Sequence, residues 1–136
     1  MIHLFDTSGL VRPLGDPTLQ KVWYDMIDAG AIASCYPQRV EFPHSARSGR
    51  EYDEITEMFD DLYPEIAVPK NAGRWIGAVR HRMAGAGEYR SASAVDPMIA
   101  ATAAHHGLTV PHDDTDYRTV ARHAPDLTEH GIHDIV

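Results

Sequence analysis

Residues 2–36 read IHLFDTSGLVRPLGDPTLQKVWYDMIDAGAIASCY, and this stretch decides the fold class. The short apolar run from Ile2 to Phe5 predicts a first strand that ends at Asp6. The run from Ala31 to Tyr36 is continuously apolar, as strands buried on both faces are, and predicts a second strand.

A well-marked helix separates these two strands. Asp16 can cap its N-terminus, Pro17 suits the first helical position, and Gly30 stands where a left-handed residue would end it. Apolar residues recur between them at helical spacing: Leu19, Val22, Trp23, Met26 and Ile27. A strand, a helix and a second strand in this order predict a parallel pairing.

The alternation of strands and helices continues to the end of the chain. Further helices are predicted at 39–47, 52–62, 72–83, 97–106 and 115–123, and further strands at 66–68, 108–110 and 132–136. We therefore expect an α/β fold with a mostly parallel central sheet of four to five strands, covered by helices on both faces. A length of 136 residues favours one domain, residues 1–136.

The composition narrows the function. The formal net charge of −8 argues against a protein that binds nucleic acid through a broad basic face. The single cysteine, Cys35, lies in an apolar stretch and is interpreted as a buried small hydrophobe. Neither a signal peptide nor an apolar run long enough to span a bilayer is evident, so we expect a soluble, cytoplasmic protein with no membrane association.

Four carboxylates are predicted to gather at one edge of the sheet. Asp6 follows the first strand and Asp114 follows the strand at 108–110. Asp96 stands at the N-cap of the helix that begins at Pro97, and Glu41 lies about one turn into the helix after the second strand. Functional crevices in parallel sheets lie beyond the carboxyl ends of the strands, where these residues fall.

Carboxylates held together repel one another unless a cation joins them. An all-oxygen site suits Mg²⁺, with Mn²⁺ as an alternative, and does not suit Zn²⁺ or copper. Mg²⁺ bound through few carboxylates keeps positions open for phosphate oxygens and water, as metal-assisted phosphodiester hydrolysis requires.

Four segments resemble the PIN-domain ribonucleases, especially the VapC toxins of bacterial toxin–antitoxin pairs. They are LFDTSGLV, RVEFPHSAR, RSASAVDPMIAATAAHHG and LTVPHDDTDYRTVA, in the family's order and spread over nearly the whole chain. The resemblance implies a PIN-like three-layer α/β/α fold and Mg²⁺-dependent endonucleolytic cleavage of RNA. It implies metal binding and catalysis by Asp6, Glu41, Asp96 and Asp114. It also implies a cognate VapB-type antitoxin, whose C-terminal segment lies across the active site, and a homodimer.

Three prolines depart from the family's pattern. Pro97 follows Asp96 directly, at a helical position that accommodates proline. Pro111 removes a backbone donor and is tolerable only at a strand end. Pro43 lies two residues after Glu41, in the helix that must aim this side chain, and is expected to bend or shorten it.

Each acidic residue also has an ordinary structural interpretation. Asp6, Thr7 and Ser8 suit a turn, although Thr7 or Ser8 can equally orient Asp6 or a metal-bound water. Glu41 can be a solvated helix residue, and Asp96 can be a plain N-cap. Asp116 is expected to cap the last helix or to hold a water in the second shell of the metal.

Two other functions stay open. One is a non-catalytic binding module that uses the PIN fold only for partner contact. The other is an aspartate-based phosphotransfer protein, which is disfavoured because a phosphatase of this kind needs a second Asp where Ser8 stands.

Overall fold

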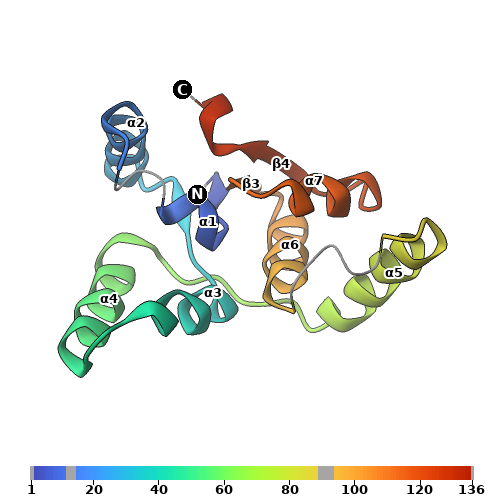
Figure 1. The fold of residues 1–136 in the computed structure, drawn as a ribbon, viewed down its shortest axis with the longest axis horizontal. Coiled ribbons are helices and arrows are strands. Elements are labelled where there is room, and N and C mark those ends of the chain that lie inside the picture. The colour runs from blue at the N-terminus through green and yellow to red at the C-terminus, as the bar shows by residue number, and fades with distance from the viewer. Residues whose placement is uncertain (1, 12–14, 89–93, 136) are drawn as a thin grey trace.

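A computed structural model describes residues 2–11, 15–88 and 94–135 (Figure 1). Four short parallel strands form one sheet in the order β2-β1-β3-β4. They are β1 (His3–Leu4), β2 (Ile32–Ala33), β3 (Thr109–His112) and β4 (Thr128–Gly131). The predicted α/β class and the mostly parallel sheet of four to five strands are confirmed.

Helices connect the strands and cover the sheet. In the described residues they are α1 (Thr7–Val11), α2 (Pro17–Asp28), α3 (Tyr36–Glu41), α4 (Gly49–Leu62), α5 (Ala72–Gly85), α6 (Val95–His106) and α7 (Thr115–Arg122). Two 3-10 helices, η2 (Phe42–Ser45) and η3 (Ile132–Ile135), complete the order. No helix in this part of the chain is long and apolar enough to cross a membrane.

The two sides of the sheet bury separate cores, because successive strand residues point to opposite faces. Leu4 packs in a core with residues of α5, α6 and α7, whereas the next residue, Phe5, packs with residues of α2 and α4. On β2, Ile32 belongs to the second core and Ala33 to the first. This alternation produces the three layers of the predicted α/β/α architecture.

Several predicted signals of α2 and α6 are present as expected. Asp16 accepts hydrogen bonds from the backbone N–H groups of Thr18 and Leu19, at 3.0 and 3.3 Å, and Pro17 is the first helical residue. Gly30, after α2, and Gly107, after α6, both adopt the left-handed conformation.

Two predicted strands are wrong. Residues 66–68 form no strand: an isolated bridge joins Glu65 to Ser34, the residue after β2. The segment lies between Pro64 and Pro69, and neither proline has an N–H to extend the pairing. Residues 132–135 form η3, and residue 136 lies outside the described residues.

The last strand is instead β4, whose sequence TEHG is polar and largely accessible. An edge strand needs hydrogen bonds on one side only and does not need an apolar pattern, so periodicity does not reveal it.

One close approach fixes α1 against the sheet. A Cβ atom built on Gly9 would lie 2.5 Å from the carbonyl oxygen of Pro111 in β3. Only glycine allows this close contact. The same Pro111 carbonyl accepts a hydrogen bond from the Asp6 backbone N–H at 3.0 Å, so β3 positions both Asp6 and the start of α1.

Candidate metal centre

Asp6 lies at the carboxyl end of β1, where the chain turns into α1. Its side chain is 3% exposed. Oδ2 accepts hydrogen bonds from the backbone N–H and the hydroxyl of Ser8, at 3.2 and 2.6 Å. Oδ1 is buried and has no hydrogen-bond partner among the described residues. A buried carboxylate oxygen without a partner is costly, and a bound cation would remove that cost.

Glu41 is the last residue of α3. Its Oε1 accepts a hydrogen bond from the hydroxyl of Thr7 at 2.7 Å. Pro43 does shorten the helix: α3 ends at Glu41 and the chain continues as the tighter η2. The helix that was predicted at 39–47 also begins three residues earlier, at Tyr36. Glu41 is thus the last residue of the helix and not a residue within it.

Asp96 is the second residue of α6 and is 8% exposed. The prediction that it caps the helix is wrong, because α6 begins at Val95 and its N-cap is Ala94. Pro97 is consequently the third helical residue. It is tolerated there because the first four N–H groups of a helix have no partner within the helix.

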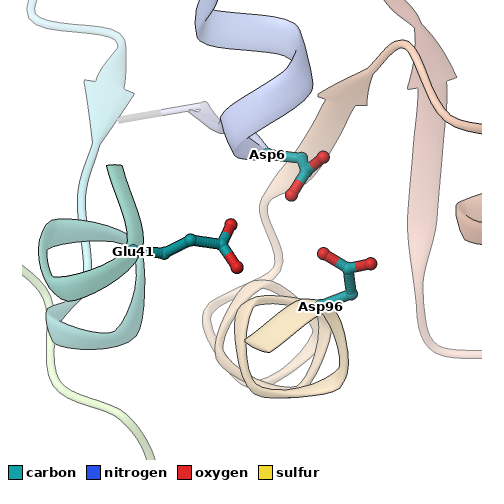
Figure 2. A group of neighbouring side chains, drawn as sticks. All are labelled: Asp6, Glu41 and Asp96. Carbon is teal, nitrogen blue, oxygen red and sulfur yellow. The ribbon is translucent and has the colours of Figure 1, made fainter. Parts of the chain in front are cut away.

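These three carboxylates converge. One oxygen from each of Asp6, Glu41 and Asp96 lies within 4.8 Å of the others. Figure 2 shows the side chains pointing toward one another from the turn before α1, from α3 and from α6. Three carboxylates at this separation repel one another strongly and attract a hard divalent cation.

Asp114 does not join this group in the structure. It is the N-cap of α7, and its Oδ1 accepts a hydrogen bond from the backbone N–H of Asp116 at 2.9 Å. The expectation that Asp116 caps the helix is therefore wrong. Burial, followed by the nearby charge of Asp114, raises the pKa of the Asp116 carboxyl above its usual value.

Three buried polar residues near the carboxylates were not singled out from the sequence. Tyr117 donates its hydroxyl proton to the backbone carbonyl of Asp96 at 3.0 Å, and burial followed by the charges of Asp6 and Asp96 raises its pKa far above 10. His112 stacks on the Tyr117 ring and contacts Glu129 at 2.6 Å. Gln38 donates to the carbonyl of Phe5, directly before Asp6.

A sequence signal existed for only one of these residues. Tyr117 is the aromatic residue of the quoted element HDDTDY, and an aromatic three residues after an N-cap at Asp114 falls on the inward face of α7. Gln38 and His112 each stand among residues of mixed polarity, where no periodic pattern marks them as buried.

The residues present fit a hard divalent cation. All ligand atoms in the group are carboxylate oxygens, and the geometry brings three of them together. Asp6 also has a buried oxygen, Oδ1, that finds no hydrogen-bond partner in the part of the chain that the structure describes. Oxygen ligands of this kind are typical of Mg²⁺ and Mn²⁺ sites.

Comparison with known proteins identifies the family. The ribonuclease VapC6 from Mycobacterium tuberculosis is 50% identical over 97 residues, which cover 71% of this chain and 76% of that protein. The ribonuclease VapC2 from the same species is 32% identical over 134 residues, which cover 96% of this chain and 92% of that protein. No protein-family model matches the chain.

Solved structures support the fold. The VapBC2 complex from Rickettsia felis, bound to a DNA fragment from its promoter, matches with a TM-score of 0.77 and 14% identity, over 96% of this chain and 98% of that chain. VapBC-5 of Mycobacterium tuberculosis, a member of the VapBC family of toxin–antitoxin systems, matches with a TM-score of 0.62 and 19% identity, over 96% and 98% of the two chains. With relatives this similar along most of its length, the chain belongs to the VapC family of PIN-domain toxins.

Proposed function

We propose that this protein is the toxin of a toxin–antitoxin pair and a metal-dependent endoribonuclease. The observation that carries the proposal is the convergence of Asp6, Glu41 and Asp96 from three separate elements, in a chain 50% identical to a protein named as a ribonuclease. Buried acids are costly to hold together, and a metal site that acts on phosphodiesters gives this arrangement a chemical purpose.

Asp6, Glu41 and Asp96 are the residues that would hold Mg²⁺, or Mn²⁺ in its place. When bound, the ion supplies positive charge for the scissile phosphate and favours the attack of water. Thr7 and Ser8 fix the orientation of Glu41 and Asp6 through their hydroxyl groups. We also assign Asp114 a catalytic and metal-binding role. This role is a supporting one, at the margin of the site, because the Oδ1 atom of Asp114 already caps α7.

The attacking group in this proposal is water and not the 2′-hydroxyl of the RNA. The expected products therefore carry a 5′-phosphate and a 3′-hydroxyl. The acidic surroundings of the site also imply that substrate affinity depends on the metal, because the chain has a formal charge of −8 and RNA is an anion.

A VapB-type antitoxin is the partner that we propose. The solved complexes to which this chain is similar contain such a partner. An apolar pocket of about 350 Å³, lined by Leu10, Trp23, Phe42, Ile55 and Met58 among others, offers a surface for an apolar segment of it. We also propose a homodimer, supported by the exposed apolar side chains of Tyr36 and Val40 on one face of α3. A cytoplasmic location follows from action on cellular RNA.

The proposal is tested by incubating a mixed RNA pool with the purified protein and mapping the new ends by sequencing. We expect cleavage that requires Mg²⁺ or Mn²⁺ and stops with a chelator. Asp6→Asn should lower the rate by at least about 100-fold. Asp25→Asn, which changes an exposed acid on α2, is the matched control and should cleave as the wild type does.

Two results would contradict the proposal. Full activity of a folded Asp6→Asn variant would show that the carboxylate group is not the active site. Metal binding by calorimetry, without cleavage of any RNA in the pool, would favour the non-catalytic binding module instead.

A further inference from the structure

A second pocket lies on the same edge of the sheet as the three carboxylates. It has a volume of about 160 Å³ and opens between the carboxyl ends of β3 and β4 and the first turn of α7. Asp113, Asp114, Thr115, Arg118, Gly131 and Asp134 are among its lining residues. We call it the corner pocket.

Two hydrogen bonds join the corner pocket to the carboxylate group. The backbone N–H of Asp113 donates to the Ser8 hydroxyl oxygen at 3.0 Å, and the same hydroxyl donates to Asp6 Oδ2 at 2.6 Å. A molecule in the pocket would therefore lie next to whatever occupies the space beside Asp6.

Gly131 keeps the corner pocket open. This glycine, the last residue of β4, does not have a positive φ, so its backbone conformation is open to any residue. A Cβ atom there would lie 3.0 Å from both the Arg118 Nη2 and the Asp134 Oδ2 atoms. A side chain at position 131 would therefore push against the ends of the Arg118 and Asp134 side chains, which line the pocket.

The polar groups of the pocket fit a base better than a phosphate. Arg118 supplies N–H donors, and Asp134 supplies acceptor oxygens 3.7 Å from Arg118 Nη2. Asp113, whose carboxylate lies 3.8 Å from the lining residue His133, and Asp114 add further negative charge, which would repel a phosphate. A nucleobase edge sets N–H donors beside acceptor atoms, and a donor next to an acceptor in the protein is its complement.

We propose that the corner pocket binds one unstacked base of the RNA, next to the phosphate that is cut. This inference rests on the proposed ribonuclease function and adds to it the source of sequence preference. Guanine is the base we expect, since arginine contacts its O6 and N7 atoms most often and a carboxylate accepts from its N–H groups. Single-stranded RNA presents bases in this way, in loops and at ends.

The test compares cleavage-site profiles on a random RNA pool. The wild type should show enrichment of guanine at one fixed position near the cut. Gly131→Val fills the pocket, and Arg118→Leu removes its donor. Both variants should reduce that enrichment toward unity and raise KM for the preferred oligonucleotide about tenfold, the size expected for one specific base contact.

A matched control lies one turn further along the same helix. Arg122 is 63% exposed, against 59% for Arg118, and pairs with Glu88, three residues after the end of α5 and away from the pocket. Arg122→Leu should keep the wild-type profile. Calorimetric Mn²⁺ binding and the melting temperature should stay unchanged in Gly131→Val and Arg118→Leu, which shows that the fold and the carboxylate group are intact.

The outcomes separate this inference from the proposed function. Cleavage with an unchanged profile in both Gly131→Val and Arg118→Leu would overturn the corner pocket as a base site and leave the ribonuclease proposal standing. Wild-type protein that binds Mn²⁺ but cuts no RNA would overturn both. Loss of preference in Arg122→Leu as well would show a general charge effect and would also overturn the inference.

Discussion

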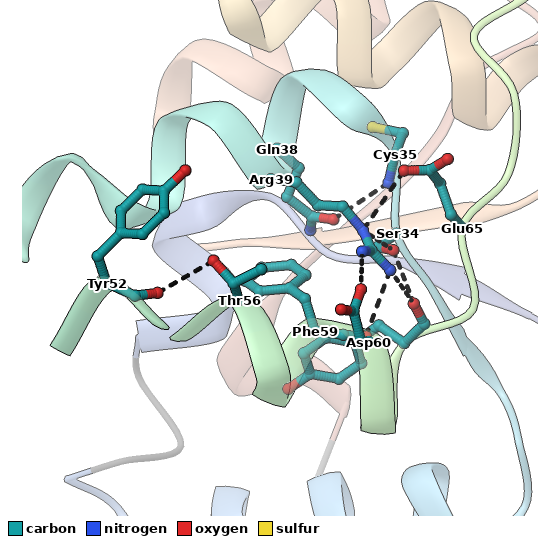
Figure 3. Close-up of polar contacts among 10 residues, drawn as sticks. Ser34, Cys35, Gln38, Arg39, Tyr52, Thr56, Phe59, Asp60 and Glu65 are labelled. Carbon is teal, nitrogen blue, oxygen red and sulfur yellow. Dashed lines mark hydrogen bonds and ion pairs between the residues drawn. The ribbon is translucent and has the colours of Figure 1, made fainter. Parts of the chain in front are cut away.

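The charged side chains on the two sides of α3 have opposite electrostatic surroundings. On one side Arg39 is surrounded by acceptors: Nε donates to the Ser34 hydroxyl at 3.0 Å, Nη1 pairs with Asp60 at 2.6 Å, and Nη2 donates to the carbonyl of Tyr63 at 2.9 Å (Figure 3). Two residues later Glu41 faces the other way, toward Asp6 and Asp96. Cation and acceptors attract on the first side, and like charges repel on the second.

This difference explains how so short a helix can carry a metal-binding residue. A helix of six residues is not stable alone, and repulsion between Glu41 and its neighbours would tend to push it away. Arg39 ties it to β2 and to the end of α4. Gln38, 1% exposed, ties it to β1 by donating to the Phe5 carbonyl. The carboxylate group is held in place by attractive contacts elsewhere on the same helix.

The largest effect is expected when the attractive side is broken. Arg39→Met removes the donors but keeps an apolar stem, so the buried Ser34 hydroxyl and the Tyr63 carbonyl each lose a charged hydrogen-bond donor. We expect the free energy of unfolding to fall by about 2–4 kcal/mol, measured by urea denaturation.

Arg50→Met is the control for this loss. Arg50 is 89% exposed and pairs with Glu54 one turn away on α4, so its replacement should change stability by less than about 0.5 kcal/mol. Equal losses in both variants would show that Arg39 is an ordinary surface charge and would remove the basis of the comparison.

The carboxylates on the repulsive side depend on the close packing of Gly9 in α1 against β3. A substitution at Gly9 is expected to cause the next largest loss of stability. Gly9→Ala brings a Cβ within 2.5 Å of the Pro111 carbonyl oxygen, where backbone must move. We expect a loss of about 2–3 kcal/mol. Thermal melts should also show a weaker response to Mg²⁺, because α1 carries Ser8 and Thr7, which orient Asp6 and Glu41.

Gly77→Ala is the control for this experiment, and it should raise stability where Gly9→Ala lowers it. Gly77 lies exposed inside α5 with nothing within 4 Å of a Cβ atom, so alanine should stabilise the protein by about 0.5–1 kcal/mol. Tolerance of alanine at both positions would disprove the tight contact between α1 and β3.

Removing a negative charge from the repulsive side should raise the free energy of unfolding, whereas removing Arg39 should lower it. Asp6→Asn relieves repulsion and supplies N–H donors near Glu41 and Asp96, so the metal-free protein should gain about 1–2 kcal/mol. The rise in melting temperature with millimolar Mg²⁺, expected for the wild type from ligand linkage, should disappear. Asp25→Asn should change neither quantity. A less stable Asp6→Asn protein in chelator would contradict the repulsion.

The same comparison shows which parts of the site were predictable. Asp6 follows an apolar run and precedes a turn, so its place at the sheet edge could be predicted from pattern alone. Glu41 could not, because its place depends on where α3 begins. That start is set by Gln38 and Arg39 through contacts with β1 and α4, distant in sequence.

Other differences from the predictions have equally local causes. Asp114 was grouped with the other acids by its place after a strand and by family resemblance; in the structure it caps α7, and its Oδ1 accepts from the Asp116 N–H. Residues 66–68 were expected to form a strand because they are apolar. In the structure Ile66 and Val68 pack against the core of α5 and α6, and backbone pairing stops at the Ser34–Glu65 bridge, where the Ile66 N–H donates to the Ser34 carbonyl at 2.8 Å. An apolar pattern predicts that a segment is buried, but it does not predict whether its backbone is hydrogen-bonded to a neighbouring strand.

The smallest effect is expected at Cys35, the N-cap of α3, which lies between the two sides. It is 0% exposed, and burial, opposed by smaller effects of Gln38 and Arg39, raises its pKa to about 11. The native thiol should therefore resist alkylation at pH 8 and react only after unfolding.

The raised pKa of Cys35 also gives stability a defined pH dependence. Because the folded protein keeps the thiol protonated, ionisation favours the unfolded chain once pH exceeds the usual value of 9.0. The wild type should lose stability relative to Cys35→Ala between pH 9 and about 11, and by less than about 1 kcal/mol at pH 9.5. Below pH 8 the difference between the two proteins should be constant and reflect packing alone. A thiol that reacts quickly in the native state would place Cys35 at an accessible surface and would mean that the N-terminus of α3 is not anchored as Gln38 and Arg39 require.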